Sequence, residues 1–464
     1  MRVSITAMFA LALCVSAVPV TAQNTQPPAP PAADASKGGV PGVKPIQSEK
    51  YKTTYIELGN DGEGLLFEPA ADGPKERIAM VFSHPNRNTF GEPLGPEMAS
   101  RGYRVLMVNY RGDADSPEGL PEEYLPSMSK AIAYLRSLPG TERVVLVGHS
   151  GGAHLSSLYE NVAEHGPSAC QGPEKIYPCD GKELDGLEKP DGLILLDPTI
   201  GAGHQMSAVD PAVREHGRDR SLDMFSASNG YDRAAKRANY SQSFAKHFYH
   251  AQAARNASIV DRALERLHLI SKGKGDFAND EPYVIRGIGV RSSGARLYQT
   301  DTSFVSHTKK PHLLLRADGT ETEEIVTSVR PPMGQNVVDA LDDLDVMNDE
   351  TTIRRFLAGS AIRTTADYAI TADDIVGVNW NSAYNSTPAN AEGVSVPALV
   401  LTMTCHYLVV PGEIIFDRLG SKDKTYAAVE GATHVFKACK PEYGDTVKHT
   451  FDFVDAWLAK EGRF

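Results

Sequence analysis

Residues 144–154, VVLVGHSGGAH, constrain the fold of this chain more than any other segment. The first four are apolar and mostly branched, too few for a helix, and they predict a strand buried on both of its faces. A helical pattern begins directly after the glycines, with apolar side chains on one face at Leu155, Leu158, Tyr159 and Val162. The segment therefore predicts a strand that turns at once into a helix.

Ser150 stands in the middle of this turn, in the pattern Gly148-His149-Ser150-Gly151-Gly152. A strand that passes through Gly-x-Ser-x-Gly into a helix is the context of a nucleophile elbow, in which a strained turn lifts the serine hydroxyl clear of the sheet. Glycines suit this turn because a Cβ at either end of the motif would collide with the neighbouring strand or helix. A glycine-rich turn without a catalytic serine is the alternative, but the flanking strand and helix favour Ser150 as a nucleophile.

The composition is typical of a globular protein with a sizeable core, at 41% hydrophobic and 23% charged residues over 464 positions. That length suits one large decorated domain or roughly two to three ordinary ones. The formal net charge of −12 argues against nucleic acid and anionic membranes as partners.

Residues 1–22 predict a secretory signal peptide. Arg2 is followed by an apolar run over residues 5–20 and by Val20-Thr21-Ala22, which is similar to a cleavage site. A membrane anchor is the alternative, but the run is short, and no later segment is long and apolar enough to span a bilayer. Residues 23–45 are rich in Pro and Ala and predict a linker. The mature chain is therefore expected to be secreted or periplasmic.

Cleavage after Ala22 would leave four cysteines, Cys170, Cys179, Cys405 and Cys439. An even number in an oxidising compartment predicts two disulfides, for which three pairings exist. Pairing Cys170 with Cys179 would close a short Pro/Gly-rich loop, and pairing Cys405 with Cys439 would tie together two later segments. A metal site is the alternative, although neither pair has the C-x-x-C spacing.

Short apolar runs alternate with helical patterns over residues 46–198 and 394–464. This alternation predicts an α/β fold with a mostly parallel, doubly wound sheet that helices cover on both faces. The alternation breaks off over residues 199–393, where a long helical pattern spans 241–270. We expect this stretch to be a large, mainly helical cap inserted into the sheet domain.

With these motifs in this order, the chain resembles the α/β-hydrolase superfamily. IAMVFSHPN at 78–86 is similar to the strand and loop of the oxyanion hole, NYRGDADS at 109–116 to the turn after the next strand, and VGHSGG at 147–152 to the nucleophile elbow. EGATH at 430–434 follows the last predicted strand and is similar to the loop that carries the catalytic histidine. The resemblance implies that Ser150 is the nucleophile and His434 the general base, with an acid between them in the sequence.

The acid is where the chain departs from the superfamily pattern. His406 stands where members usually carry an aspartate, after the predicted strand at 397–402. Asp197 ends the preceding strand, a position that some members use for the acid, whereas Glu413 follows the deviant loop and could reach back. Asp197 is also explained as a turn residue before a proline, and Glu413 as a carboxylate in the first turn of a helix. We favour Asp197 and keep Glu413 as the alternative.

The expected function follows from an activated serine. The oxyanion hole should combine the backbone N–H of Gly151 with that of Asn86, because Pro85 has no N–H. An acyl-enzyme on Ser150 favours hydrolysis of a carboxylic ester of a small or medium-sized organic substrate. An amidase or peptidase and a C–C bond hydrolase use the same residues, and a binding protein that has lost its acid is the alternative from another class. No cofactor or metal is implied, and the sequence leaves the oligomeric state open.

Overall fold

Short runs of branched and aromatic residues form a ten-stranded sheet in the computed structural model, which describes residues 48–59, 62–85, 87–110, 119–214, 216–288, 295–332 and 348–464. The predicted signal peptide (1–22), the predicted linker (23–45) and Asn86 lie outside these ranges. Within the ranges, no helix combines the length and the apolar character needed to cross a membrane.

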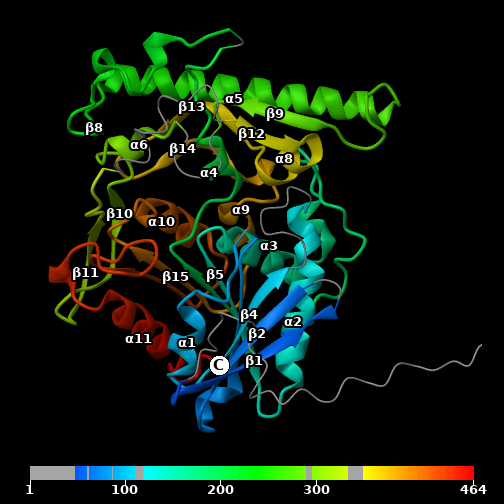
Figure 1. The fold of residues 1–464 in the computed structure, drawn as a ribbon, viewed down its shortest axis with the longest axis vertical. Helices are drawn as coiled ribbons and strands as arrows, with labels where there is room; N and C mark the ends of the chain where they lie inside the picture. Colours follow the sequence, from blue (N-terminus) through cyan, green and yellow to red (C-terminus); the bar gives the residue numbers. More distant parts are fainter. Residues whose placement is uncertain are drawn as a thin grey trace, which may run out of the picture. The chain divides into compact units, whose positions relative to one another are not determined.

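The strands of the sheet follow the order β1-β2-β4-β3-β5-β6-β15-β16-β10-β11 (Figure 1). From β4 to β10 in this order all neighbours run parallel, whereas β1, β2 and β11 join through antiparallel pairs at the two edges. The predicted, mostly parallel sheet is therefore confirmed. The strands are β1 (Tyr51–Glu57), β2 (Gly62–Pro69), β3 (Ile78–Ser83), β4 (Arg104–Tyr110), β5 (Arg143–His149), β6 (Gly192–Leu196), β10 (His307–Leu315), β11 (Glu321–Thr327), β15 (Ala398–Met403) and β16 (Lys424–Val429).

Helices cover both faces of the sheet because alternate residues of each buried strand point to opposite sides. In β5, Val144 and Leu146 join a hydrophobic core with α2, α3 and α10, whereas Val145 and Val147 join a second core with α1 and α11. Figure 1 shows α1 and α11 on one side of the sheet and α2 and α3 on the other. These helices are α1 (Leu94–Ala99), α2 (Leu125–Ser137), α3 (Gly152–His165), α10 (Val409–Arg418) and α11 (Thr446–Leu458).

The segment between β6 and β15 departs from the predicted single insertion. Strand β10 pairs with β16 in parallel, and β11 pairs with β10, so both belong to the central sheet. The predicted cap boundary of 199–393 is corrected accordingly: the described residues of 199–306 and of 328–393 lie outside the sheet, and we call them the insertion segments. The correction has a physical reason, since the parallel pairing of β10 is made with a strand more than a hundred residues away and leaves no local pattern.

The insertion segments contain helices and, in addition, short antiparallel strand pairs that the sequence does not predict. Strand pairs β7–β8, β9–β12 and β13–β14 are antiparallel. A separate core joins the long helix α5 with β9 and α8. The elements are α4 (Ala202–Met206), β7 (Tyr231–Asp232), β8 (Arg237–Ala238), α5 (Gln242–Ser271), β9 (Pro282–Arg286), α6 (Leu297–Thr300), β12 (Asn348–Thr352), α8 (Ile353–Gly359), β13 (Arg363–Ile370), β14 (Ile375–Asn379) and α9 (Thr387–Ala391).

Candidate active site

Ser150 lies on a strained turn between β5 and α3. Its backbone φ is 56°, a left-handed value that non-glycine residues seldom adopt. A Cβ at Gly148 would lie 2.5 Å from the carbonyl oxygen of Gly152, and a Cβ at Gly152 would lie 2.5 Å from that of Ser83. Only glycine fits at these two positions, so the motif follows from the close approach of β3 and α3 to the turn.

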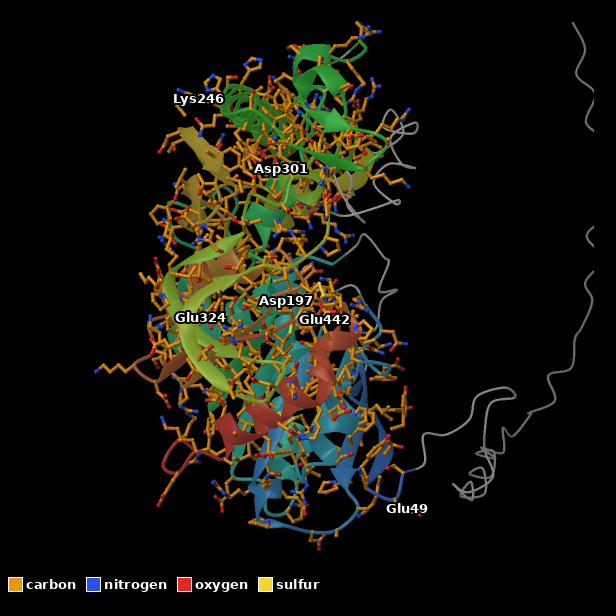
Figure 2. The ribbon with its side chains drawn as sticks, turned by 90° about the vertical axis from the view of Figure 1, so that its left-hand side faces the viewer. Glu49, Asp197, Lys246, Asp301, Glu324 and Glu442 are labelled. Carbon is orange, nitrogen blue, oxygen red and sulfur yellow. A yellow bond between two sulfur atoms is a disulfide. The ribbon has the colours of Figure 1, made fainter. Side chains whose placement is uncertain are left out.

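His434 and Asp197 reach this turn from the ends of two other strands. His434 lies in the loop after β16, and its Nε2 accepts a hydrogen bond from Ser150 Oγ at 2.9 Å. Its Nδ1 donates to Oδ2 of Asp197 at 2.6 Å. In the side view of Figure 2, Asp197 lies at mid-height, below Lys246 on α5 and above Glu49, which precedes β1. The structure thus brings together the serine, the histidine and the favoured acid that the sequence singles out.

The strand next to β6 holds the Asp197 carboxylate in place. Asp197 follows β6 directly and is fully buried, and its backbone N–H donates to the carbonyl of Leu401 at 2.7 Å. Its Oδ1 accepts from the backbone N–H of Met403 at 3.2 Å. Both partners belong to β15, so the direction of the carboxylate is set by the sheet itself.

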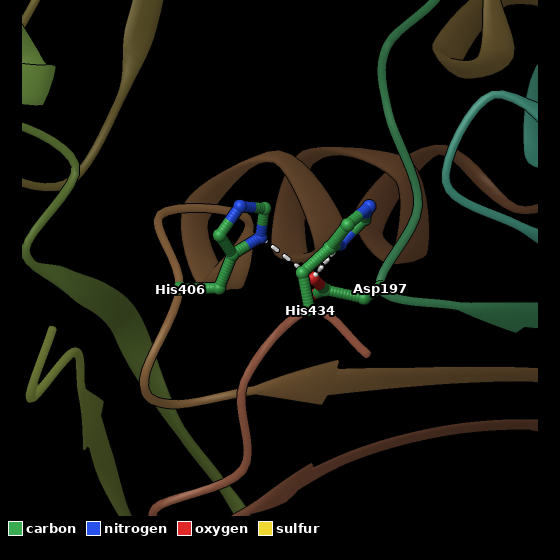
Figure 3. Close-up of side chains that lie close together, drawn as sticks. All are labelled: Asp197, His406 and His434. Carbon is green, nitrogen blue, oxygen red and sulfur yellow. Dashed lines mark hydrogen bonds and ion pairs between the residues drawn. The ribbon is translucent and has the colours of Figure 1, made fainter. Parts of the chain in front are cut away.

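A second imidazole contacts the same carboxylate. His406 lies in the loop after β15, and its Nδ1 donates to Oδ2 of Asp197 at 2.6 Å. Figure 3 shows the two imidazoles meeting at this one side chain. The ring centroids of His406 and His434 are 4.4 Å apart. In the sequence, His406 stands out only as the replacement of an expected acid, and nothing there indicates its contact with Asp197.

Asp197 carries its charge in this arrangement. Burial by itself raises the pKa of the Asp197 carboxyl, but His406 and His434 together outweigh burial and hold that pKa below its ordinary value. Burial lowers the pKa of His406, despite the neighbouring carboxylate. At neutral pH an ionised Asp197 therefore accepts its hydrogen bond from a neutral His406.

His149, the residue before the serine, supports His434 from the sheet side. Its Nε2 donates to the backbone carbonyl of His434 at 2.7 Å, and the two ring centroids are 4.6 Å apart. Burial lowers the pKa of His149 well below its ordinary value, so the ring is neutral and carries its proton on Nε2. The sequence places His149 toward the sheet but does not reveal this contact.

The structure describes one of the two backbone N–H groups that we expect to form the oxyanion hole. Gly151 is the N-cap residue of α3, so its N–H stands at a helix N-terminus, where the helix dipole favours negative charge. The second predicted donor, Asn86, lies outside the described residues. Of the two predicted donors, the structure therefore describes the position of Gly151.

Glu413, the alternative acid, is engaged elsewhere. Its Oε1 accepts from Nε2 of His312 at 2.8 Å, and its two carboxylate oxygens also accept from the backbone N–H groups of Lys309 and Lys310, at 2.7 and 3.0 Å. These donors all belong to β10, so Glu413 fastens α10 to the sheet. The alternative acid is therefore corrected, because Glu413 is bonded to β10 and not to His434.

Two disulfides form, in one of the three pairings that the sequence leaves open. Cys170 and Cys179 have their Cα atoms 5.6 Å apart, and Cys405 and Cys439 have theirs 6.3 Å apart. The second disulfide joins the loop after β15, which carries His406, to the loop after β16. The predicted disulfides are confirmed, and one of them links the two loops that deliver imidazoles to Asp197.

Among the described residues, the donor atoms of Asp197, His406 and His434 lie within 4.8 Å of one another, close enough to hold a metal ion. Both Nδ1 atoms already donate to Oδ2 of Asp197, and a metal would have to replace both protons. We therefore assign these three residues as a hydrogen-bonded group and not as metal ligands.

A small cavity lies beside this group. Its walls include Ile200 and Tyr407, which follow the site residues closely in the loops after β6 and β15. Thr199, the residue before Ile200, donates its backbone N–H to the carbonyl of Ser150 at 3.2 Å. The other walls are mainly aromatic and aliphatic: Gly203, His204, Ser207, Tyr298, Val305, Tyr368, Ile370, Ile375 and Pro411. Such walls suit an apolar group better than a charged one.

A model of the alpha/beta hydrolase family matches residues 81–436, a range that contains the serine, the aspartate and both of its imidazole partners. No curated protein matches the chain.

Three solved structures align with most of this chain. Brefeldin A esterase, described as a bacterial homologue of human hormone sensitive lipase, is 14% identical over 92% of this chain and 81% of its own, with a TM-score of 0.39. A fungal esterase from Rhizomucor miehei is 14% identical over 88% and 84%, with a TM-score of 0.36. DcsB in complex with a substrate analogue is 11% identical over 88% and 98%, with a TM-score of 0.42. At these values the activities of those proteins are not carried over to this chain.

Proposed function

We propose, from the premise that this chain belongs to the alpha/beta hydrolase family, that it is a serine hydrolase that cleaves a carboxylic ester of a small or medium-sized organic substrate. One observation carries the proposal: the hydrogen-bonded series of Ser150, His434 and Asp197, with 2.9 Å and 2.6 Å between the contacting atoms. A serine hydroxyl is a weak nucleophile until an adjacent base takes its proton, and this series supplies the base and the group that orients it.

In the first half of the reaction, Ser150 Oγ attacks the ester carbonyl carbon while His434 Nε2 takes the hydroxyl proton. The Asp197 carboxylate keeps Nδ1 of His434 protonated and stabilises the imidazolium that forms. The N–H of Gly151 faces the negative charge that develops on the carbonyl oxygen. When the tetrahedral intermediate collapses, the C–O bond to the alcohol breaks, the alcohol oxygen takes the proton from His434, and the acyl group remains on Ser150.

Water completes the cycle. His434 Nε2 takes a proton from water as the water oxygen attacks the acyl carbon. The bond between that carbon and Ser150 Oγ then breaks, and Oγ regains the proton from His434. The products are a carboxylic acid and an alcohol, and the residues return to their starting protonation states.

The walls of the small cavity next to Tyr407, about 10 Å³ in volume, indicate the chemical character of this side of the site. Its walls are mainly aromatic and aliphatic, and burial lowers the pKa of His204 well below its ordinary value, so this wall is neutral at pH 7. Neutral, mostly apolar surroundings leave a charged group without compensation, which supports an uncharged substrate.

Amides and activated C–C bonds are the alternative substrates, since the same residues support their cleavage. We place esters first because resonance stabilises an ester carbonyl less than an amide carbonyl, so Ser150 attacks the ester carbon more readily. A binding protein that has lost its acid is not favoured, because Asp197 already supplies a carboxylate at 2.6 Å from His434. We further propose that the protein acts outside the cytoplasm, which the two disulfides support.

Labelling with a fluorophosphonate tests the proposal. We expect one adduct on Ser150 of the wild type by peptide mapping and none on a Ser150→Ala variant. A series of p-nitrophenyl esters of increasing acyl length, compared with the matching p-nitroanilides, then separates ester from amide hydrolysis. Ester turnover by Ser150→Ala at the wild-type rate, or a folded wild type that takes no adduct, would contradict the proposal.

A further inference from the structure

His406 touches the candidate active site, but the proposed reaction gives it no task. Its ring lies between Tyr407, at 4.1 Å between ring centroids, and His434, at 4.4 Å. Its Nδ1 makes a hydrogen bond to a buried, ionised carboxylate at 2.6 Å, on Oδ2 of Asp197. Hydrogen bonds to charged groups are roughly twice as strong as those between neutral groups. The position of the carboxylate therefore depends on His406.

The backbone around His406 is fixed from several sides. Its N–H donates to the carbonyl of Met403 at 3.1 Å, and its own carbonyl accepts from Oγ of Ser328 at 2.7 Å. Arg330 Nη1 donates to the same Ser328 Oγ at 2.9 Å, from the segment after β11. The residue before His406 forms the disulfide to Cys439. Segments next to β11, β15 and β16 together deliver this imidazole to the carboxylate.

We propose that His406 is a positioning residue, which fixes the Asp197 carboxylate for His434 by donating its Nδ1–H to the oxygen that His434 also uses. The proposal rests on the proposed function above, since the carboxylate needs this orientation only if His434 serves as a base. The proposal assigns a role to His406, which stands where the superfamily resemblance places the catalytic acid.

The shared oxygen determines the tautomer of both rings. A carboxylate oxygen only accepts, so His406 and His434 must each carry a proton on Nδ1. In the neutral rings Nε2 is then unprotonated, and Nε2 of His434 is free to accept the hydroxyl proton of Ser150 at 2.9 Å. The arrangement thus keeps the base in the tautomer that the reaction requires.

Loss of the His406 N–H has two effects on the site. The carboxylate loses one of its donors and turns more freely, which lowers kcat. It also becomes more basic, because its remaining donors among the described residues are His434 and the backbone N–H of Met403. A more basic Asp197 either takes up a proton itself or stabilises a protonated His434. In both cases the pair binds a proton at higher pH, so the acid limb of kcat/KM moves to higher pH.

Other titratable groups around this pair stay unchanged in such an experiment. Burial lowers the pKa of His149 and His204 well below the ordinary value, and that of His154 to about 4, so these rings are neutral near pH 7. Burial also lowers the pKa of Arg330 to about 10, which leaves it charged. Among the described residues, five titratable groups interact electrostatically with Asp197, His406 or His434: His149, His204, Arg330, Tyr407 and Tyr426.

Two substitutions separate hydrogen bonding from packing. His406→Leu replaces the imidazole by a side chain of similar size that has no hydrogen-bond donor. We expect kcat to fall by roughly tenfold to a hundredfold and the acid limb of kcat/KM to move to higher pH. His406→Asn places an amide N–H close to the former Nδ1, because Nδ2 of Asn and Nδ1 of His are both attached to Cγ. We expect it to retain kcat within about threefold and to retain the wild-type acid limb. His250→Asn on the exposed side of α5 is the matched control.

The tautomers are measured directly by NMR on protein labelled with 15N-histidine. We expect protonated Nδ1 in both rings and two low-field proton signals, one of which disappears in His406→Asn and the other in His434→Asn. An unprotonated Nδ1 in His406, or a folded His406→Leu variant with wild-type kcat and acid limb, overturns the proposal. Failure of Ser150 to take a fluorophosphonate overturns the proposed function instead, and the NMR result is independent of that outcome.

Discussion

Replacing Asp197 by Asn removes the charge while keeping the shape of the side chain. Oδ1 of Asp197 accepts from the backbone N–H of Met403, and the amide oxygen of Asn preserves this bond. The amide NH2 then lies where Oδ2 accepted from His434 and His406. An amide NH2 has two hydrogens, and each can be donated to one of the two rings if that ring presents an unprotonated Nδ1.

This arrangement satisfies every polar group but leaves His434 in the wrong tautomer. Its proton moves to Nε2, which then donates to Ser150 and can no longer take the hydroxyl proton. Rotating the amide by 180° would restore the tautomer only by placing NH2 against the N–H of Met403, at a cost of about 1–3 kcal/mol in this buried site. At about 1.4 kcal/mol per factor of ten, this rarer amide orientation lowers kcat by about fivefold to 150-fold. The neutral amide also no longer stabilises the imidazolium that forms on His434, so we expect a total fall in kcat of about 10⁴, the size of effect known for a serine protease whose catalytic aspartate is replaced by asparagine.

The matched control is Glu413→Gln, which makes the same chemical change in the carboxylate that β10 binds. We expect its kcat to stay within about threefold of the wild type, while its unfolding free energy falls by about 1–3 kcal/mol because the amide NH2 faces N–H donors. Both variants are assayed with the best p-nitrophenyl ester, and their fold is checked by circular dichroism. A kcat for Asp197→Asn within tenfold of the wild type, or a large loss for Glu413→Gln, would refute the assignment of the acid.

Two further results are expected. Replacing Cys405 and Cys439 by serine removes a cross-link across 34 residues, so we expect a loss of about 4 kcal/mol of unfolding free energy in denaturant titrations and a lower kcat. Replacing Cys170 and Cys179 by serine removes a cross-link across 9 residues, so we expect a loss of about 2.5 kcal/mol of unfolding free energy and an unchanged kcat. Equal kcat values in the two double variants would contradict a role of the Cys405–Cys439 disulfide in the site. The folded-state pKa of Asp197 is lowered, so its ionised form stabilises the fold above the ordinary carboxyl pKa of about 4, and this contribution is lost as pH falls below it. The difference in unfolding free energy between the wild type and Asp197→Asn should therefore shrink from about pH 6 toward pH 2, and a constant difference would show that the pKa is not lowered.

The parts of the site that the sequence predicts are those that need particular residues close together in the chain. The turn at Ser150 needs glycines on both sides, and the 2.5 Å approaches at Gly148 and Gly152 show why that pattern is readable from a few residues. The loop of His434 and the end of β6 at Asp197 are recognisable because each directly follows a buried apolar run. These features depend on neighbours in the sequence, so periodicity and motif spacing suffice.

The contacts that the sequence does not predict are made across the sheet. His149 reaches the backbone of His434, and His406 reaches Asp197, over separations of 285 and 209 residues. Strand β10 likewise joins the sheet through a strand far along the chain. Such residues come together through the order of the strands in the sheet, and the local spacing of residues in the sequence does not predict that order.

The strand order also suggests that the acid of this site can be moved by one strand. β6 and β15 are neighbours and run parallel, so Asp197 and His406 emerge at the same edge of the sheet. His406→Asp alone would place two carboxylates side by side in a buried site, where one of them must take up a proton, and we expect it to lower kcat. Combined with Asp197→Asn, the same change leaves one carboxylate, now after β15. We expect the double variant to recover at least about tenfold in kcat over Asp197→Asn, because a carboxylate next to His434 restores the Nδ1–H tautomer. If the double variant is no faster than Asp197→Asn alone, the loop after β15 cannot present an acid to His434, and the task of His406 is confined to the carboxylate that follows β6.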